Sequence, residues 1–517
     1  MRKFSKLFLA TVIALGMGFT ACNSDDVPTA PSSVDGDSWA SITVKFPAGA
    51  TLKASLPGDY NEKGTYTGRD VIETVDVFLV NAGTGTVNYN SFAKSSFAEI
   101  DETGVLKPNL ALTATAGENI KVYAVINGNS DILNTLKGTG AAGFATAFAG
   151  EATKNAADVA TFISADKKEK IMMTNDEDDY TINVEAGVTK EDAIAGTANH
   201  VQVNVDRVVS RAMLTVQTEA TTGSGWPVKA TIGGAETEIA TVTGVTYAVG
   251  QSNKKFYIMK KSDYQVPAPV YTYTPGENWA TEANTMFDYS GLASFTEVTQ
   301  YTYNADLEGL PALLNAEETS KFVLPVNHLI DKTPAEAREG YKKGNTTYME
   351  IRATFVPKEV DGAAYTGAAE TVYLGANDSK FYSTRELAEA EGQQATEYKD
   401  GVMKYVIWLN PNDLVATPAL PNPMVSPTVR NQVYHAHINA FTAMGVPNNP
   451  LNPGQPGDPD DPDNPEIPGD PDDPNNPKNP IDPEDPLKTD VTYLSVSVKV
   501  LPWTMHSYGI NLGEDIY

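Results

Sequence analysis

The chain has 517 residues, which is long enough for two or three domains with hydrophobic cores of their own. It is acidic, because 66 Asp and Glu residues outnumber 38 Lys and Arg residues and give a formal net charge of −28. Such a charge repels nucleic acid and anionic lipid, so the composition argues against both as partners. Tyr is plentiful, with 24 residues, and together with abundant Thr, Val and Gly it favours sheets and turns over helices.

The first 21 residues have the pattern of a secretory signal peptide. Residues 1–6 are basic, residues 7–17 are apolar, and small residues ending in Ala21 precede the single cysteine, Cys22. The apolar run is too short to span a bilayer. The sequence here resembles the lipobox of bacterial lipoproteins, which implies cleavage between Ala21 and Cys22 and lipidation of Cys22. A plain signal peptide followed by a chance cysteine is the alternative.

Residues 39–443 contain many short strand candidates separated by Gly, Asn, Asp and Pro. Segment 41–46 alternates polar and apolar residues, which places Ile42, Val44 and Phe46 on one face of an expected strand. Further strands are predicted at residues 74–80, 120–126, 201–205, 212–217, 348–356, 371–374, 405–409 and 432–441. The better helical candidates are residues 305–316, 334–343 and 385–392.

A proline occupies every third position from Pro447 to Pro486. Glycine does not keep that period, so the segment is not a collagen repeat. A polyproline II helix has three residues per turn and rises about 3.1 Å per residue, so this segment is expected to form an extended acidic rod. The rod is interpreted as a spacer, so its function depends on the segment that follows it.

A strongly alternating strand is predicted beyond the rod, at residues 493–501. One face carries Leu494, Val496, Val498 and Val500. An exposed amphipathic strand is an aggregation hazard, so this one is expected to dock on its own chain or on another molecule. Docking by strand addition combines backbone hydrogen bonds with side chains that fill pockets. Trp503 follows as a candidate anchor at the end of such a groove, the alternative being a chain end packed on its own domain.

The two ends of the chain together suggest a way to make that groove. The strand containing Ile42, Val44 and Phe46 precedes a Gly- and Pro-rich stretch that carries Lys53, Lys63 and Arg69. A trypsin-like protease that cuts in this stretch would release the first strand. The vacated place would suit an alternating aliphatic strand, and residues 493–501 have that pattern.

Several segments resemble the major subunit of the short (minor) fimbriae of Bacteroidetes, the type V pilins. The acidic residues 23–26 after Cys22 resemble the stretch that directs lipoproteins of these bacteria to the cell exterior. The ending, a strand at residues 493–500 followed by Leu-Pro-Trp, is the most specific similarity. The other similar segments are residues 201–212, 381–382, 405–409 and 429–434.

This resemblance implies a mainly β fold with two tandem transthyretin-like β-sandwich domains and few short helices, followed by the polyproline rod and a C-terminal donor strand. It implies an outer-membrane lipoprotein precursor, a structural role in a surface fimbrium for adhesion and biofilm formation, and polymerisation by donor-strand exchange. Alignment of the first strand places the propeptide cut between Lys53 and Ala54, with Lys63 and Arg69 as further candidates. The implied partners are identical subunits, anchor and tip accessory subunits, a trypsin-like protease and a host or bacterial surface receptor.

The expected organisation follows from these features, with two sandwiches that meet near residues 196–200. The expected segments are a signal peptide (1–21), a propeptide with tether and first strand (22–53), an N-terminal sandwich (54–198), a C-terminal sandwich (199–445), an acidic Pro-x-x linker (446–490) and the donor strand (491–517).

Few residues suggest chemistry. His435 and His437 lie two apart on one face of an expected strand, as a metal pair would, but no further ligand stands at suitable spacing. The acidic run 175–179 lacks the spaced ligands of a calcium loop and is interpreted as a solvated loop. Arg207 and Arg211 are interpreted as solubilising charges at a strand end. No catalytic motif, metal or cofactor is therefore expected.

The alternatives are a monomeric surface lipoprotein that binds a glycan or a host protein, and an anchor or tip subunit of a fimbrium. A monomer has no use for a detached amphipathic strand behind a long rod. An anchor should keep its lipid and resist cleavage, and a tip should need no free donor strand. The intact strand at residues 493–501 favours the stalk.

Overall fold

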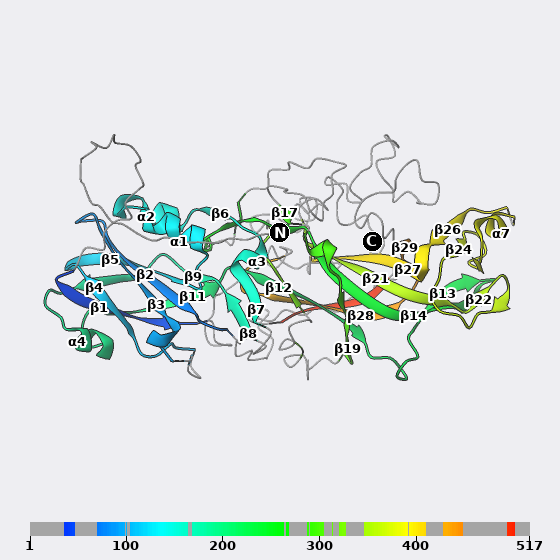
Figure 1. Ribbon diagram of the computed structural model, residues 1–517, viewed down its shortest axis with the longest axis horizontal. Helices are drawn as coiled ribbons and strands as arrows, with labels where there is room; N and C mark the ends of the chain where they lie inside the picture. Colours follow the sequence, from blue (N-terminus) through cyan, green and yellow to red (C-terminus); the bar gives the residue numbers. More distant parts are fainter. Residues whose placement is uncertain are drawn as a thin grey trace, which may run out of the picture.

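The structure, a computed structural model, is an elongated molecule in which two β-sheet units lie end to end (Figure 1). It is mainly β, with few short helices. The residues described are 36–46, 70–98, 100, 104–163, 168–262, 265–267, 287–288, 290–303, 313, 320–326, 346–390, 392–409, 428–447 and 494–501. Among these residues no helix is long and apolar enough to cross a membrane.

The first unit is built on an eight-stranded sheet with the order β3-β2-β5-β9-β11-β1-β4 and with β10 paired to β5. Its strands are β1 (Ser38–Lys45), β2 (Thr74–Asn81), β3 (Thr86–Ala93), β4 (Leu110–Ala114), β5 (Gly117–Ile126), β9 (Met173–Asn175), β10 (Thr181–Val184) and β11 (His200–Arg207).

Two helices cover one face of this sheet, α1 (Ser130–Lys137) and α2 (Ala141–Phe148) (Figure 1). Asn129 caps α1 by accepting a hydrogen bond from the Asp131 amide, which satisfies one of the free donors of the first turn. From α2, Phe144 packs 4.9 Å from Phe78 on β2, measured between ring centroids. The helices shield this face from water, which explains why β2 is buried on both faces.

The second unit contains an eleven-stranded sheet with the order β19-β12-β28-β13-β14-β21-β27-β29, to which β18, β20 and β30 add as side pairs. Its strands are β12 (Ser210–Gln217), β13 (Trp226–Ile232), β14 (Ala235–Gly250), β18 (Thr296–Glu297), β19 (Thr299–Tyr301), β20 (Ser320–Val323), β21 (Tyr348–Pro357), β27 (Val402–Trp408), β28 (Val433–Phe441), β29 (Val446–Pro447) and β30 (Leu494–Leu501).

Smaller elements complete the described part of the chain. The small sheets pair β6 (Glu151–Thr153) with β16 (Lys255–Tyr257), β7 (Ala160–Ile163) with β8 (Lys168–Ile171), β15 (Ser252–Asn253) with β17 (Phe287–Asp288), β22 (Glu359–Val360) with β23 (Ala363–Ala364), and β24 (Val372–Gly375) with both β25 (Phe381–Tyr382) and β26 (Ala395–Tyr398). The remaining helices are α3 (Ala156–Val159), α4 (Lys190–Ala195), α7 (Arg385–Glu389), η1 (Lys94–Ser96), η2 (Ser290–Ala293) and η5 (Lys399–Gly401).

The predicted strands are present as β1, β2, β5, β11, β12, β21, β24, β27 and β28. The helix predicted at 385–392 is present as α7, whereas 305–316 and 334–343 lie almost wholly outside the described residues. The domain boundary expected near residues 196–200 stays a prediction, and the chain changes sheets further along. After His200 the chain continues along β1 as β11, so it passes from the first sheet to the second only at Val208–Val209.

The hydrophobic core continues through the junction between the two units. The cluster that fills the first unit also contains Met213 and Phe256 from the second unit. A small sheet crosses the same junction, because β16 pairs antiparallel with β6. A second cluster, which includes Tyr247 and Phe355, fills the second unit. Shared core and shared hydrogen bonds join the two units at one continuous interface.

Candidate functional site

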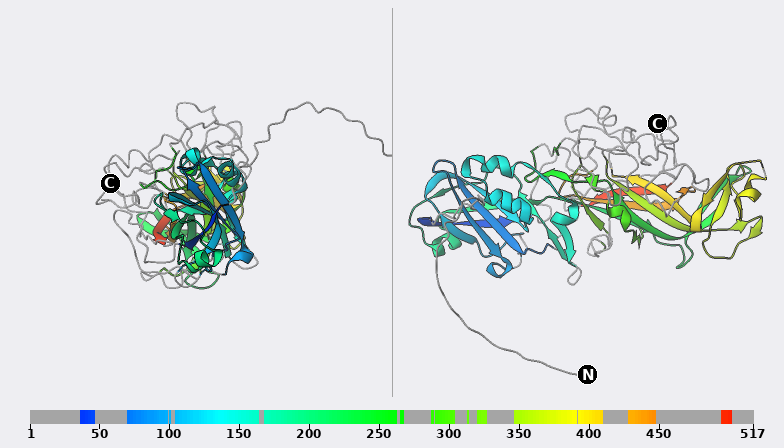
Figure 2. Two further views of the ribbon diagram at one scale, coloured as in Figure 1. Left: turned by 90° about the vertical axis from the view of Figure 1, so that its left-hand side faces the viewer. Right: turned by 45° about the horizontal axis from the view of Figure 1, so that its top comes forward.

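The first strand of the chain, β1, lies inside the sheet of the first unit (dark blue in Figure 2). It pairs in parallel with β11, with Ser41 opposite His200, and antiparallel with β4, with Ser41 opposite Ala111. Both edges of β1 are therefore hydrogen-bonded. Its removal would leave a slot with two unpaired strand edges, which is a ready template for another strand.

One face of β1 forms part of the hydrophobic core. Ile42 is 0% exposed, Val44 1% and Phe46 2%, as the alternation in the sequence predicted for this face. Ala40 is the fourth side chain on the same face and is also fully buried. Full burial of a large aliphatic or aromatic side chain contributes about 1.5–3 kcal/mol, so these side chains hold β1 firmly in the first unit.

The other face of β1 carries two hydroxyls that contact one imidazole. His200 Nδ1 lies 2.8 Å from Ser41 Oγ, and His200 Nε2 lies 3.0 Å from Thr43 Oγ1. Ser41 donates to the Ala193 carbonyl and therefore accepts from Nδ1–H of a neutral ring. Thr43 Oγ1 also lies 2.7 Å from Asn109 Oδ1, so its single hydroxyl hydrogen is shared between Asn109 Oδ1 and the unprotonated Nε2. Burial, together with the nearby Lys107 cation, lowers the pKa of His200, which keeps the ring neutral at physiological pH.

The start of β1 is anchored by a further polar set that the sequence did not indicate. Ser38 Oγ donates to the Glu185 carbonyl and accepts from the Val188 amide at 3.1 Å. The Asn199 side-chain amide donates to the Trp39 carbonyl at 2.9 Å. These residues come from segments about 150 positions apart in sequence, separations that no short sequence pattern reveals.

At the other end of the chain, β30 pairs antiparallel with β28 of its own second unit (red strand in Figure 2). Val500 stands opposite Tyr434 and Leu494 opposite Phe441, with a register shift between Ile438 and Ala440. The sequence left open whether the C-terminal strand docks on its own body. In this structure its backbone pairs with the same chain.

The predicted site residues near the two ends of the chain lie wholly or partly outside the described structure. Val496, Val498 and the other apolar positions of β30 are placed by their backbone alone. The residues that lie outside the described part of the chain are Ala21, Cys22, Lys53, Ala54, Lys63, Arg69 and Trp503.

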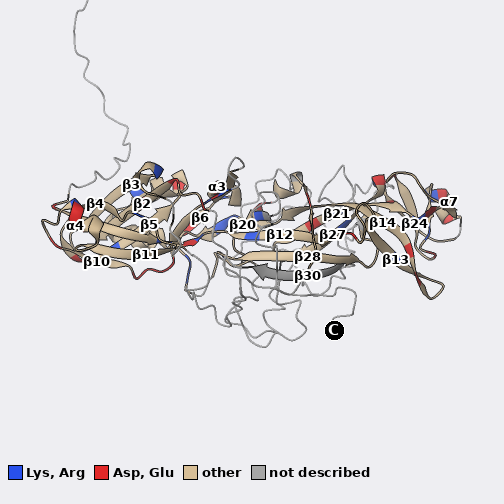
Figure 3. Ribbon diagram, turned by 90° about the horizontal axis from the view of Figure 1, so that it is seen from below, with Lys and Arg blue, Asp and Glu red and all other residues tan. Residues whose placement is uncertain are grey.

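The interpretation of Arg207 and Arg211 as solubilising charges is wrong, because both side chains are buried at the junction between the units. Arg207 is 1% exposed and Arg211 0%, and each forms an ion pair with a buried acid, Asp70 and Glu169 respectively. Figure 3 shows the Lys and Arg segments gathered around β12 and β20 at this junction. Buried charges need such partners, and here the partners belong to the first unit.

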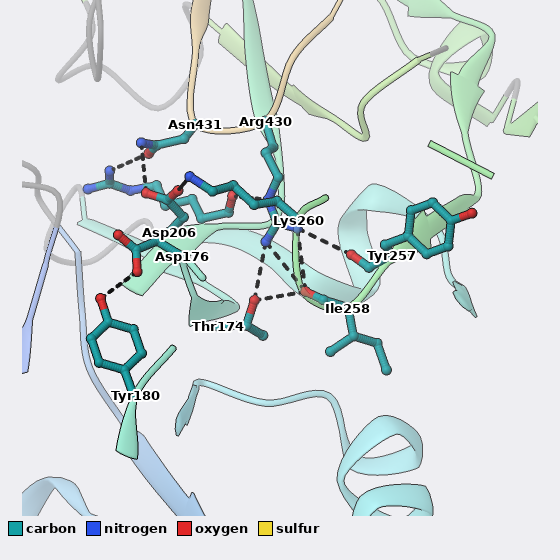
Figure 4. Close-up of polar contacts among 10 residues, drawn as sticks. Thr174, Asp176, Tyr180, Asp206, Tyr257, Ile258, Lys260, Arg430 and Asn431 are labelled. Atoms are coloured by element: carbon teal, nitrogen blue, oxygen red, sulfur yellow. Dashed lines mark hydrogen bonds and ion pairs between the residues drawn. The ribbon is translucent and has the colours of Figure 1, made fainter. Parts of the chain in front are cut away.

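A hydrogen-bond network extends from Arg207 across the junction, and Figure 4 shows part of it. Asn431 accepts from Arg207 at 3.1 Å and donates to Asp206 at 3.3 Å, and Lys260 pairs with Asp206 at 2.9 Å. Arg430 donates to the backbone carbonyl of Arg207 at 3.0 Å. Because its members come from both units, the network fixes how the units meet.

The acidic run predicted as a solvated loop is partly built into the fold. Asn175 donates to the Val122 carbonyl and accepts from the Ala124 amide, each at 2.8 Å. Asp176 accepts from the Tyr180 hydroxyl at 2.6 Å, and burial raises the pKa of Asp176. Among the described residues no group of three or more His, Cys, Asp or Glu side chains is arranged to hold a metal ion.

Comparison with known proteins decides the family. A family model described as the C-terminal part of the major fimbrial subunit protein type IV, fimbrillin, matches residues 396–509. Two sequences of the minor fimbrium subunit Mfa1 of Porphyromonas gingivalis are each 31% identical over 535 residues, covering 98% of this chain and 99% of the relative. The chain belongs to this family of fimbrial subunits.

Two solved structures of fimbrial proteins from the same organism also match the fimbrial subunit. Fimbrilin (fimA) of strain W83 has a TM-score of 0.34 at 14% identity, covering 80% of this chain and 94% of that chain. The tip fimbrial protein Mfa3 with a C-terminal truncation has a TM-score of 0.32 at 8% identity, covering 78% of this chain and 94% of that chain.

The two histidines of β28 are structural in this fimbrial subunit. Thr215 on β12 lies between them, with its Oγ1 2.7 Å from His435 Nε2 and 2.8 Å from His437 Nδ1. The remaining nitrogen of His437 lies 3.2 Å from Gln217 Oε1. Burial lowers the pKa of His437 to about 4, so the ring is neutral at physiological pH.

Proposed function

We propose that this fimbrial subunit is exported as a lipoprotein, loses its first strand to a trypsin-like protease, and polymerises when β30 of one copy fills the slot left by β1 in the next. The observation that carries the proposal is the position of β1 between β11 and β4, at the start of the chain and joined to the rest only through residues 47–69. A single cut in that segment would separate the strand from the remainder of the chain.

The energetics favour replacement of the strand once it is cut. Loss of Ile42, Val44 and Phe46 uncovers core positions that are at most 2% exposed in the intact chain. It also leaves the backbone groups of β11 and β4 that faced β1 without partners, and unpaired buried backbone groups are costly. A strand with four aliphatic residues on one face would offset both losses, at about 1.5–3 kcal/mol for each buried side chain.

The processing that we propose divides the chain into its working parts. The signal peptide (1–21) is removed and Cys22 is lipidated, which carries the precursor to the outer membrane. The propeptide (22–53) leaves after a cut between Lys53 and Ala54, or after Lys63 or Arg69. Sandwiches at 54–198 and 199–445 form the body, with the first sandwich extended to Arg207 by β11. The linker (446–490) then lets the donor strand (491–517) reach a neighbouring copy.

The polymer would serve as a fimbrial stalk for surface attachment and biofilm formation. Its partners are identical subunits, anchor and tip subunits, and a receptor on a host or bacterial surface. The net charge of −28 disfavours binding to nucleic acid and to anionic lipid. Contact with a membrane is therefore confined to the lipid of the precursor. The relatives are fimbrial structural subunits, in line with a role without catalysis.

Brief trypsin treatment of the purified subunit, beginning just after Cys22, tests this function. The digest is run unheated on a denaturing gel, and the new N-terminus is determined by mass spectrometry. We expect a ladder of polymers that appears only after the first strand is lost and that vanishes when residues 487–517 are deleted. A trypsin-resistant monomer, or a ladder that persists after that deletion, would refute the stalk assignment and favour a monomeric surface lipoprotein.

A further inference from the structure

The strand that leaves and the strand proposed to replace it share one residue pattern. Residues 39–46 have the sequence W-A-S-I-T-V-K-F, and residues 493–500 have the sequence Y-L-S-V-S-V-K-V. Aligned without a gap, the two segments are identical at Ser, Val and Lys positions, and they pair Trp with Tyr, Ile with Val and Thr with Ser. The similarity includes the polar face, which burial of an apolar face alone does not require.

Contacts to the polar face of β1 can determine the register of the strand that fills the slot in the first unit. His200 contacts both hydroxyls of β1 through its two ring nitrogens, and Asn109 contacts the second hydroxyl. Ser41 is 0% exposed and Thr43 6%, so these hydroxyls make their polar contacts away from water. A replacement strand that brought no hydroxyl to these two points would leave buried polar groups without partners.

We propose that the donor strand of a second copy enters the slot in the direction and register of β1, an inference that rests on the proposed function. His200 and Asn109 select that register. Ser495 then takes the position of Ser41, and Ser497 takes the position of Thr43. The contacts of the leaving strand are made again by the entering one. His200 and Asn109 act as positioning residues for the partner copy.

Neighbouring registers fail on this polar face. A shift by one residue turns the aliphatic side chains away from the core. A shift by two in one direction brings Lys499 to the position of Thr43, beside the neutral His200 ring and near Lys107. A shift by two in the other direction brings Tyr493 to the fully buried position of Ser41. Only the unshifted register presents a serine hydroxyl at both points.

The ends of the strand determine its direction. In the direction of β1, Tyr493 takes the position of Trp39, whose ring lies 5.1 Å from the Lys190 ammonium. An aromatic ring at this position keeps that cation–π contact. In the reversed direction Lys499 would take this position and bring a second ammonium group beside Lys190, which costs electrostatic energy.

Cysteine cross-linking between two kinds of copy tests the register and the direction. The chain after Cys22 has no other cysteine, so introduced pairs report without background. The acceptor is trypsin-cut, lacks residues 487–517 and carries Thr113→Cys or Ala111→Cys. The donor is uncut and carries a single cysteine. Because Trp39 stands opposite Thr113 in the sheet, Tyr493→Cys should form a disulfide with Thr113→Cys.

The control pairs differ only in position. Cα atoms directly opposite in an antiparallel pair lie about 4.5–5.5 Å apart and can be bridged, whereas diagonal neighbours lie about 7–8 Å apart and cannot. Tyr493→Cys with Ala111→Cys, and Ser495→Cys with Thr113→Cys, report the two shifted registers. Lys499→Cys with Thr113→Cys reports the reversed direction. A mixed complex that cross-links through a control pair would overturn this register while leaving strand donation standing. Absence of any mixed complex would refute the proposed function and the register together.

A second measurement tests the hydroxyl contacts without a cysteine. Loss of one such hydrogen bond in Ser497→Ala should speed release of the donor copy about 2- to 10-fold. Ser497→Thr, which puts the Thr43 side chain at that position, should release at the unmodified rate. On a His200→Leu acceptor the difference between Ser497 and Ser497→Ala should shrink. Equal release rates for all three donors on the unmodified acceptor would refute the role of His200.

Discussion

The junction between the two units depends on a buried ion pair whose energetic role can be measured directly. Arg211 on β12 is 0% exposed, and its guanidinium carbon lies 5.3 Å from the Phe162 ring centroid and 5.6 Å from that of Phe322. Its partner Glu169 on β8 is 1% exposed, and the Glu169 carbonyl also accepts from the Val71 amide at 2.7 Å. The pair therefore joins β12 to the first unit where water is excluded.

Removal of either charge alone should be strongly destabilising. Glu169→Met leaves the Arg211 cation buried without its counter-charge, and Arg211→Met does the same to the Glu169 anion. Each single variant should therefore lower the free energy of unfolding by about 3–5 kcal/mol. Replacement of both by methionine removes both charges and keeps apolar volume, so the double variant should lie within about 2 kcal/mol of the unmodified chain. The coupling energy is then at least about 4 kcal/mol.

Urea unfolding of the chain that begins after Cys22, followed by tryptophan fluorescence and by circular dichroism, gives these energies. The matched control is the surface pair Lys229–Glu236, whose atoms lie 3.3 Å apart and whose side chains are 51% and 75% exposed. Glu236→Gln should change stability by less than about 1 kcal/mol. If the single variants at the buried pair also cost less than about 1 kcal/mol, or if their costs simply add in the double variant, the assigned role of the pair is wrong.

Three further predictions follow from buried groups elsewhere in the chain. Burial lowers the pKa of His437 to about 4, so between pH 6.5 and 4 the unfolded chain binds a proton that the folded chain does not. The free energy of unfolding should therefore fall by about 3 kcal/mol as the pH drops through this window. A His437→Gln variant whose urea midpoint falls as steeply with acid would contradict this prediction. Phe46→Ala should lower the free energy that retains β1 in its sheet by about 3–5 kcal/mol, because Phe46 is buried. Lys45→Ala, at a partly exposed position, should change this free energy little. The measurement is the spontaneous release of the first strand after trypsin cleavage. Gly225→Ala should destabilise the second unit by more than about 1 kcal/mol, because the new Cβ would lie 2.2 Å from the Val242 carbonyl oxygen. In the control Gly223→Ala the new Cβ meets nothing within 4 Å, so this variant should cost about 1 kcal/mol through its positive φ alone. Equal melting temperatures of the two variants would refute the clash at Gly225.

The strands could be predicted from the sequence because their signal is local. Alternation at residues 41–46 and apolar runs at 74–80 and 120–126 determine β1, β2 and β5 through the faces that they bury. The helices α1 and α2 also had a local signal that was missed. Ile132, Leu133 and Leu136 follow a helical period after the Asn129 cap, and Phe144 and Phe148 repeat four residues apart.

The polar parts of the site could not be predicted, since their partners are distant in sequence. Arg207 and its partner Asp70 are 137 positions apart, and His200 is 159 positions from Ser41. The pattern around each residue is that of an ordinary polar position near a strand end. Only the fold brings the partners together, which is why two arginines interpreted as surface charges are buried and why His200 was not identified as a site residue.

In the assembly that we propose, the pairing of β30 with its own β28 explains how strand donation would wait for cleavage. Within the described residues β30 pairs with β28 alone, whereas the slot of β1 offers two strand edges, β11 and β4. Before cleavage, β1 is covalently attached to the slot that it fills, so its effective concentration there exceeds that of any donor strand in solution. After cleavage that advantage is lost, and a donor strand can exchange the single edge of β28 for two edges and buried polar contacts. The proposed cut would therefore change the preferred place of β30 without any other change in the body, as the proposed assembly requires of a subunit that remains monomeric until it is processed.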